Sequence, residues 1–503
     1  MAIPSFFKTV SVGLMSSFLV SSCTVGPDYV KPPVVVPPKF KEAKGTLKTA
    51  PVVATKWQPI KPCDALDRGE WWKVFQDPLL NDLETQLNIY NQNIANAEAN
   101  YRQSLAIVDE ARASYFPNLA GVFNVSRQKQ GGGATPFIST SGGVTTTGVA
   151  TTDSSAVSRP TTTNYGAVLN ATWEPDIWGL VRRTVEANLA VAQSNAALVA
   201  VTRLSAQGSL AQYYFELRTL DSNQKLLDDT VLAYKKTLDM TRNRYKSGVA
   251  SRADIVQAQS QLETAQAQAL NNGILRGQYE HAIAVLIGRP PAYFSLKFMP
   301  LKLKVPAIPV EIPSVWLERR PDIAQAERLV QNTSALIGVA IAAYYPNLTL
   351  TATASAAARS FKDLINTPTI GWSTGLQLAQ TFFDGGFRRA TVNAAKSAYM
   401  AQVAAYRQTV LTAFQDVEDM LIALRILKEQ SIVQNKAAAS AQLALKLVLN
   451  QYKAGTVAYI DVLASQVLAY NAQKAANDVN GLQMTAAVGL IKALGGGWNM
   501  SSQ

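Results

Sequence analysis

The chain has 503 residues, of which 48% are hydrophobic and only 16% are charged, and its formal net charge is +12. This charged fraction is low for a soluble protein, yet no run of about 18 apolar residues predicts a membrane-spanning helix. The basic residues are scattered and do not form a block interleaved with aromatic residues, so we do not expect nucleic acid to be bound.

Residues 1–22 are typical of a signal peptide, because Lys8 precedes a mildly apolar stretch that ends in small residues. Cys23 follows directly, which resembles the bacterial lipobox and implies that a lipid is attached to this cysteine. An ordinary signal peptide with a chance cysteine is the alternative. Thr24, rather than an aspartate, follows Cys23, which favours transport of such a lipoprotein to the outer membrane. The remaining cysteine, Cys63, cannot form an internal disulfide.

Residues 23–77 are predicted to form an extended arm, because eight prolines lie between positions 24 and 63. Helical texture then runs from near Pro78 to about Ser114. A strand-like run over 119–127 follows, and a stretch rich in Gly, Thr and Ser at 131–163 is predicted to be a loop.

A second alternating run covers 165–173. From about Arg182 to Tyr245, apolar residues recur every three to four positions, which favours coiled-coil packing. At ~1.5 Å per residue, these residues span roughly 95 Å. Gly248 breaks the pattern, and a second helix is predicted from about Ala253 to Ile287.

The plan then repeats after a Pro-rich connector at 289–320. Tyr245-Lys246-Ser247-Gly248 returns as Tyr452-Lys453-Ala454-Gly455, and Asp254 returns as Asp461, at the same offset. Recurrence of motifs in one order indicates an internal duplication. The domains are therefore repeat 1 at 78–288, repeat 2 at 321–494 and a tail at 495–503. Repeat 2 is predicted to contain helices at 321–343, 387–454 and 460–494, and strands at 348–356 and 371–381.

The four predicted strands have about the length that a membrane strand needs, ~9–11 residues. One face carries apolar side chains and the other carries polar ones, which fits a lipid-facing barrel. A soluble sheet with one buried face is the alternative. The apolar set is Trp173, Trp372, Leu376 and Leu378, and the polar set is Asn170, Thr172, Ser373 and Gln377.

Four strands cannot close a membrane barrel, since open edges in lipid leave backbone groups unpaired. The chain is therefore expected to oligomerise, as two copies with eight strands or three copies with twelve. An aromatic girdle is expected where strands meet helices, at Tyr115, Phe116, Trp178, Tyr344 and Tyr345.

Motifs spread over nearly the whole mature chain resemble those of the TolC-like outer membrane factors, in particular the OprM/NodT-like lipoprotein branch of efflux channels. The resemblance implies an α+β membrane protein of a Gram-negative bacterium. It also implies a homotrimer with a twelve-stranded outer membrane barrel and an α-helical tunnel through the periplasm. Its implied partners are an adaptor protein, an inner-membrane pump of the RND type and outer membrane lipid. The motifs are Cys23–Tyr29, Trp71-Trp72 with Asp77-Pro78, Tyr115–Leu119, Asp176–Gly179, Arg319–Ile323, Phe383–Gly386 and Lys492–Trp498.

The same resemblance implies a gate at the periplasmic end. It places an aspartate ring at Asp461 and a bond between Tyr452 and Asp254, with Tyr245 at the matching position of repeat 1. Arg252 is a candidate replacement for a basic gate residue that some relatives carry near Val457. The alternative for both aspartates is helix capping, because a carboxylate is favoured at a helix start.

The turns between these helices resemble the tips that dock an adaptor, and a plain helical hairpin turn is the alternative. The candidate docking residues are Gly248, Val249, Ala250, Gly455, Thr456 and Val457.

Enzymatic activity is not expected, and neither is a cofactor apart from the lipid on Cys23. Gly371–Gly375 matches the hydrolase pattern G-x-S-x-G, but alternation continues through it and the single histidine, His281, precedes it. One histidine also argues against a zinc site. The predicted function is a passive efflux conduit for drugs or other small toxic compounds. The alternative hypotheses are a channel for type I protein secretion and a lipid-anchored periplasmic adaptor.

Overall fold

The computed structural model describes residues 25–34, 36–42, 69–129, 137–141, 144–148, 161–302, 305–306, 308, 319–365 and 370–496. The predicted signal peptide, Cys23 and Cys63 lie outside these ranges. The chain divides into two compact units. We call them the sheet unit (Met1–Asp28, Ile107–Glu186 and Ala335–Lys396) and the helical unit (Tyr29–Ala106, Ala187–Ser334 and Ser397–Gln503).

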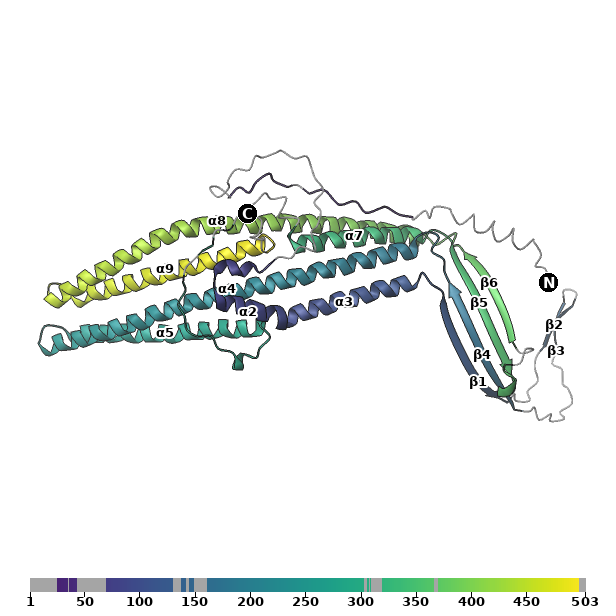
Figure 1. The fold of residues 1–503 in the computed structure, drawn as a ribbon, viewed down its shortest axis with the longest axis horizontal. Helices are drawn as coiled ribbons and strands as arrows, with labels where there is room; N and C mark the ends of the chain where they lie inside the picture. The colour runs from purple at the N-terminus through teal and green to yellow at the C-terminus, as the bar shows by residue number, and fades with distance from the viewer. Residues whose placement is uncertain are drawn as a thin grey trace. The chain divides into compact units, whose positions relative to one another are not determined.

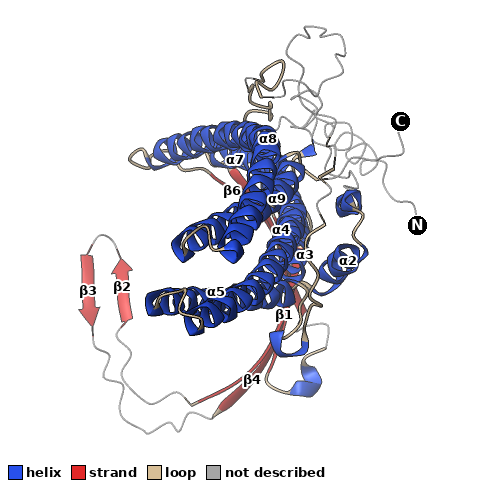
Figure 2. Ribbon diagram, turned by 90° about the vertical axis from the view of Figure 1, so that its left-hand side faces the viewer, coloured by secondary structure: helices blue, strands red, loops and turns tan. Residues whose placement is uncertain are grey.

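Two long helices dominate the chain, and each is followed by a shorter one. The α4–α5 and α8–α9 hairpins run side by side in the helical unit (Figures 1 and 2). The long helices that the apolar stripe predicts are confirmed as α4 and α8, of 67 and 68 residues. The helices are η2 Trp71–Phe75, α2 Pro78–Tyr90, α3 Gln92–Ala113, α4 Leu180–Lys246, α5 Arg252–Leu286, η3 Pro291–Tyr293, α7 Pro321–Ala342, η4 Phe361–Asp363, α8 Phe387–Ala454 and α9 Tyr459–Ala493.

Among the described residues, none of the helices combines the length and the apolar character that crossing a membrane requires.

The helical texture predicted from near Pro78 to about Ser114 is confirmed, but it forms two helices, α2 and α3, because the helix breaks at Asn91. This residue has an extended backbone and ends α2. Its side-chain oxygen accepts hydrogen bonds from the amides of Asn93 and Ile94, at 2.9 and 3.1 Å, and so caps α3. Its side-chain nitrogen Nδ2 donates to the carbonyl of Leu286 at 2.7 Å, which connects the break to the end of α5.

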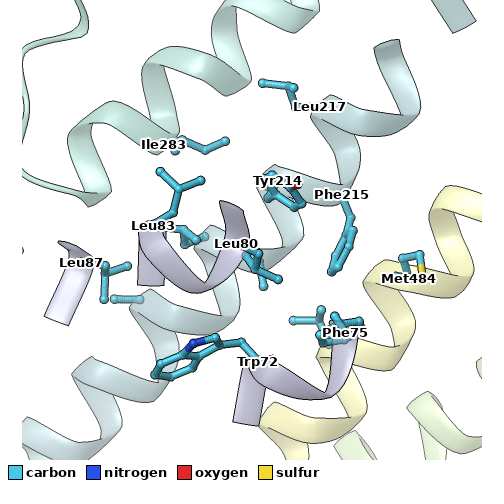
Figure 3. Packing of buried hydrophobic residues seen from close by; sticks show 14 of the residues in the cluster. Trp72, Phe75, Leu80, Leu83, Leu87, Tyr214, Phe215, Leu217, Ile283 and Met484 are labelled. Atoms are coloured by element: carbon cyan, nitrogen blue, oxygen red, sulfur yellow. The ribbon is translucent and has the colours of Figure 1, made fainter. Parts of the chain in front are cut away.

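The largest core of the helical unit forms where η2 and α2 pack on the middle of α4, the end of α5 and the end of α9 (Figure 3). Asp77 caps α2 and also accepts a hydrogen bond from the hydroxyl of Tyr214 at 2.5 Å. The indole of Trp71 donates to Gln207 at 3.1 Å. The side chains at the centre are Trp72, Phe75, Leu80, Leu83, Leu87, Tyr214, Phe215, Leu217, Ile283 and Met484.

A buried ion network holds the start of the connector against this core. Asp221 is fully buried and accepts hydrogen bonds from Arg218, at 2.9 Å, and from Arg276, at 2.7 Å. It also accepts the backbone amide of Met299 at 2.9 Å. A buried carboxylate is tolerated because it is paired and hydrogen-bonded.

The described part of the predicted arm lies against α7 and α8 in the helical unit. The hydroxyl of Tyr29 donates to Glu327 at 3.0 Å, and Phe40 is buried in a cluster with residues of α8 and α9. Farther along α8, Glu418 accepts the backbone amides of Lys41 and Glu42, at 2.7 and 3.0 Å. The carboxylate of Glu418 therefore satisfies two backbone amides of the arm.

The sheet unit contains a four-stranded antiparallel sheet in the order β1-β4-β5-β6 (Figure 1). Its strands are β1 Asn118–Gln128, β4 Thr162–Trp173, β5 Asn347–Ala358 and β6 Ile370–Ala379. All four strands that alternation predicts are therefore confirmed. Each repeat contributes two adjacent strands, and β1 and β6 form the two edges.

The register confirms the predicted separation into an apolar and a polar face. Trp173 lies opposite Leu350, which lies opposite Leu376. On the other face, Asn170 lies opposite Thr353, which donates to it at 3.0 Å and lies opposite Ser373. Because side chains alternate along a strand, a shift of one residue in any pairing would mix the two faces.

The stretch at 131–163 is not only a loop. It contains a hairpin of β2 Phe137–Ser141 and β3 Val144–Gly148, and its last two residues belong to β4. The Gly content favours the loop prediction, but the Thr and Val residues around it have high β-propensity. The sequence Gly142-Gly143 between the two runs is also a hairpin signal.

Glu84 of α2 is a buried carboxyl group with no hydrogen-bond partner for either oxygen. Burial raises its pKa well above the usual value. The folded protein therefore holds a proton on Glu84 that the unfolded chain releases above its ordinary pKa of about 4.3. The folded protein therefore loses stability as pH rises through the folded-state pKa of Glu84.

We predict that Glu84→Leu stabilises the protein at pH 8 by roughly 1–3 kcal/mol, the cost of an unsatisfied buried polar group. The gain should shrink at pH 5, and thermal unfolding at both values measures it. Asp82→Asn, at an exposed position of the same helix, is the control and should change little. Equal midpoints for Glu84→Leu and the wild type at pH 8 would contradict the prediction.

Candidate functional site at the two hairpin tips

The two hairpin tips of the helical unit reverse the chain in the same way. Gly248 and Gly455 have φ of 75° and 81°, in the left-handed region that favours glycine. The amide of Gly248 donates to the carbonyl of Tyr245 at 2.9 Å, and that of Gly455 donates to Tyr452 at 3.1 Å. The recurring Tyr-Lys-x-Gly motif therefore ends a helix and starts a turn in both copies.

Both aspartates of the predicted gate lie at the start of the second helix of their hairpin. Asp254 accepts the amide of Ser251 at 2.9 Å, and Ser251 accepts the amide of Asp254 at 3.2 Å. Asp461, which is exposed, accepts the amide of Ala458 at 3.2 Å. Helix capping is therefore present at both sites, and a position facing a pore stays a prediction.

The two tyrosines have different surroundings. Tyr452 is 2% exposed, and its hydroxyl lies 3.2 Å from the hydroxyl of Thr241. Tyr245, its counterpart in repeat 1, is 45% exposed. Within this chain Tyr452 therefore bonds to Thr241 rather than to Asp254, whose carboxylate caps its own helix. The structure thus pairs Tyr452 with α4, and the link to Asp254 stays a prediction.

Arg244 is a site residue that sequence reasoning missed. Its guanidinium donates a hydrogen bond to the carbonyl of Tyr452 and lies over that ring, 4.4 Å from the centroid. The corresponding residue of repeat 2 is Gln451. Comparison of the two copies would have found it, because only one copy carries a basic residue there.

A shared core joins the two hairpins just behind the tips. Leu238 and Ala258 come from the first hairpin, and Tyr452, Tyr459 and Val462 come from the second. Burial, followed by the nearby Tyr452, Tyr234 and Asp254, raises the pKa of Tyr459 to about 12. Its phenol is therefore neutral at physiological pH, and this core carries no charge.

The candidate docking residues do not present equal surfaces. Val249 is 64% exposed, whereas Val457 is half-buried against the shared core. Gly248, Gly455 and Thr456 are exposed, Ala250 is half-buried, and Arg252 is exposed in the first turn of α5. The first tip thus exposes an apolar side chain, and the second exposes mainly backbone and a hydroxyl.

The predicted girdle residues belong to the sheet unit, where strands meet helices. Trp178 stacks on Tyr345, with ring centroids 4.9 Å apart, and donates to the carbonyl of Pro346 at 2.8 Å. Phe116 is largely exposed, and Tyr115 and Tyr344 are partly exposed. The predicted girdle does not include Phe382 and Phe383, the most exposed aromatic side chains in the described chain.

Within the described ranges, His, Cys, Asp and Glu side chains do not gather in a group of three that could hold a metal ion. The tips consist of helix caps, one buried tyrosine and one arginine.

The sequence pattern of the family described as outer membrane efflux protein matches residues 85–289 and 312–496. The pyoverdine export outer membrane protein OpmQ of Pseudomonas aeruginosa is 32% identical over 88% of this chain and 90% of its own length. The probable efflux pump outer membrane protein TtgC of Pseudomonas putida is 28% identical over 96% of this chain and 94% of its own length.

Solved structures agree on the fold. The CmeC outer membrane channel of Campylobacter jejuni has a TM-score of 0.80 and 22% identity, with 96% of each chain covered. The MtrE outer membrane channel of Neisseria gonorrhoeae, solved in an open state, has a TM-score of 0.75 and 26% identity, covering 94% of this chain and 98% of its own.

We predict that Arg244→Ala lets the two tips separate. It removes a charged hydrogen bond worth roughly 1.5–3 kcal/mol. Spin labels at Lys246 and Lys453 should then report a broader and longer distance distribution. Arg242→Ala, at an exposed position two residues earlier, serves as the control and should leave the distribution narrow. An unchanged distribution in Arg244→Ala would show that the shared core alone holds the tips together.

Proposed function

Because this chain belongs to the outer membrane efflux protein family, we propose that it is the outer membrane channel of a tripartite efflux system. It is a conduit rather than an enzyme, and it takes small toxic compounds from an inner-membrane pump and an adaptor across the periplasm and outer membrane. The observation that carries this proposal is the match over nearly the full chain to efflux and export channels. None of the relatives named above is named for protein secretion, so the secretion alternative gains no support.

A homotrimer with a twelve-stranded barrel is the assembly we propose. Its support is the sheet itself, which has an apolar face over all four strands and ends in β1 and β6. In this arrangement β6 of one copy pairs with β1 of the next, so that no edge is left open in lipid. The apolar face then meets the lipid and the polar face lines the channel.

The periplasmic end is proposed to be gated at the tips. Asp461 is exposed beyond its capping hydrogen bond, and three such carboxylates around one axis attract cations and repel anions. Arg244 holds the α4–α5 tip to the α8–α9 tip within each chain. The gate we propose thus combines a charged ring with a contact that limits separation of the hairpins.

We predict that Asp461→Asn raises the resting conductance of trimers reconstituted in planar bilayers. Asparagine keeps an oxygen that can accept the amide of Ala458 but removes the charge, so this change separates the ring from the cap. Asp461→Ala should have the same effect. An increase in the alanine variant alone would mean that the aspartate acts only as a cap, and no increase in either would exclude the ring.

The α4–α5 tip is proposed to dock the adaptor through Val249. We predict that Val249→Trp abolishes resistance to toxic compounds while trimers still reach the outer membrane, because a bulky ring blocks the turn. Val285→Trp replaces an equally exposed valine near the far end of α5 and should leave resistance intact. Growth assays with a panel of antibiotics and dyes, read beside trimer levels, make the measurement. Retained resistance in Val249→Trp would contradict docking at this tip.

A further inference from the structure

Arg183 is a buried arginine that neither the gate nor the docking tip uses. It lies in the first turn of α4, in the sheet unit, and its side chain is 5% exposed. The pair Arg182-Arg183 recurs as Arg388-Arg389 at the start of α8, where Arg389 is exposed. Only one copy therefore buries this arginine, which indicates a role that the duplication does not explain.

The guanidinium of Arg183 binds the first described residues of the chain. It donates to the carbonyl oxygens of Val25, at 3.4 Å, and Gly26, at 3.3 Å. It also pairs with the carboxylate of Asp28 at 2.9 Å, and Glu186 holds its other nitrogen at 2.8 Å. Three contacts from one side chain fix a peptide by its backbone and by one charge.

The backbone of Trp178 makes a further contact with the peptide. The amide of Val25 donates to the carbonyl of Trp178 at 3.2 Å. The ring of Trp178 is itself fixed by its stack on Tyr345 and its hydrogen bond to Pro346. The peptide is thus recognised through a donor and two acceptors of its main chain.

Two glycines bring the peptide and α7 into direct contact. Gly26 has a φ of 103°, and a Cβ added to it would lie 2.5 Å from the Cα of Gly338. A Cβ added to Gly338 would lie 2.9 Å from the Cγ of Arg183. Neither position accepts a larger residue without a shift of its neighbours.

We propose that Arg183, Trp178 and Gly338 form a binding site for the chain's own N-terminal peptide, Val25–Asp28. This site holds the peptide without help from the acyl chain, and so determines where the lipid on Cys23 leaves the protein. The proposal takes Cys23 to carry a lipid, as the sequence around it predicts, but the peptide site is independent of efflux activity. A failure of the peptide-site proposal can therefore be distinguished from a failure of the proposed efflux function.

The test is hydrogen–deuterium exchange of the full-length trimer, read in the peptide that covers residues 23–30. Two forms are compared: the acylated protein, and Cys23→Ser exported with an ordinary cleavable signal. We expect the amide of Val25 to be equally protected in both. Rapid exchange in the non-acylated form would show that the lipid holds the peptide, and would overturn the proposal.

Gly26→Ala tests the site from the peptide side and changes no residue of α4, α7 or the sheet. Exchange should accelerate roughly tenfold or more in both forms, the effect of losing a hydrogen bond to a charged group. Val25→Ala, where only the backbone takes part in the site, is the matched control and should keep wild-type protection. Unchanged protection in Gly26→Ala would also overturn the proposal.

Arg183→Lys tests the other partner, since lysine keeps the charge but loses the planar fork. We expect the same loss of protection, with the exchange of peptides from α8 and α9 unchanged. Arg182→Lys, at the exposed neighbouring position, should match the wild type. Full protection in Arg183→Lys would show that the planar guanidinium of Arg183 is not needed to bind the peptide.

Discussion

A four-stranded sheet leaves backbone donors and acceptors unpaired along its two outer strands, and the remaining architecture depends on this constraint. The register places apolar residues of all four strands on one face, and in the proposed barrel that face meets lipid. Lipid offers no hydrogen bonds to β1 or β6. In the proposed trimer, other copies of the chain complete the sheet, and the hairpins of each copy become walls of a common tunnel.

Much of the fold was predictable because periodicity is a local property. The apolar stripe from Leu189 to Tyr245 and the alternation around Trp173 each set the type of element without knowledge of any partner. The break at Asn91 was not predictable in the same way, because the periodicity of α2 and α3 continues across it. Its reason is a hydrogen bond to Leu286, about 200 residues away in the chain.

The site was less predictable, because its contacts depend on which side chains the fold brings next to each other. Sequence comparison placed Tyr452 and the two aspartates at the tips, where the structure has them. It could not show that Thr241 and Arg244 occupy the positions around Tyr452. Likewise, a motif near the N-terminus indicated an anchor, whereas its partner Arg183 lies more than 150 residues away. The difference between the two copies at Arg244 and Gln451 is a local signal for one arginine, whereas both copies carry an arginine at the position of Arg183.

The contact of Arg244 with Tyr452 has a consequence for how a ring of tips can move. A trimer of a duplicated chain has six hairpins, and if the copies were identical their six boundaries would be interchangeable. Glutamine at position 451 removes that equivalence, since the arginine joins hairpins only within a chain. The sixfold pseudosymmetry is thereby reduced to true threefold symmetry. In the proposed trimer, we expect dilation of such a ring to begin at the three boundaries between subunits, with the two hairpins of each chain moving together.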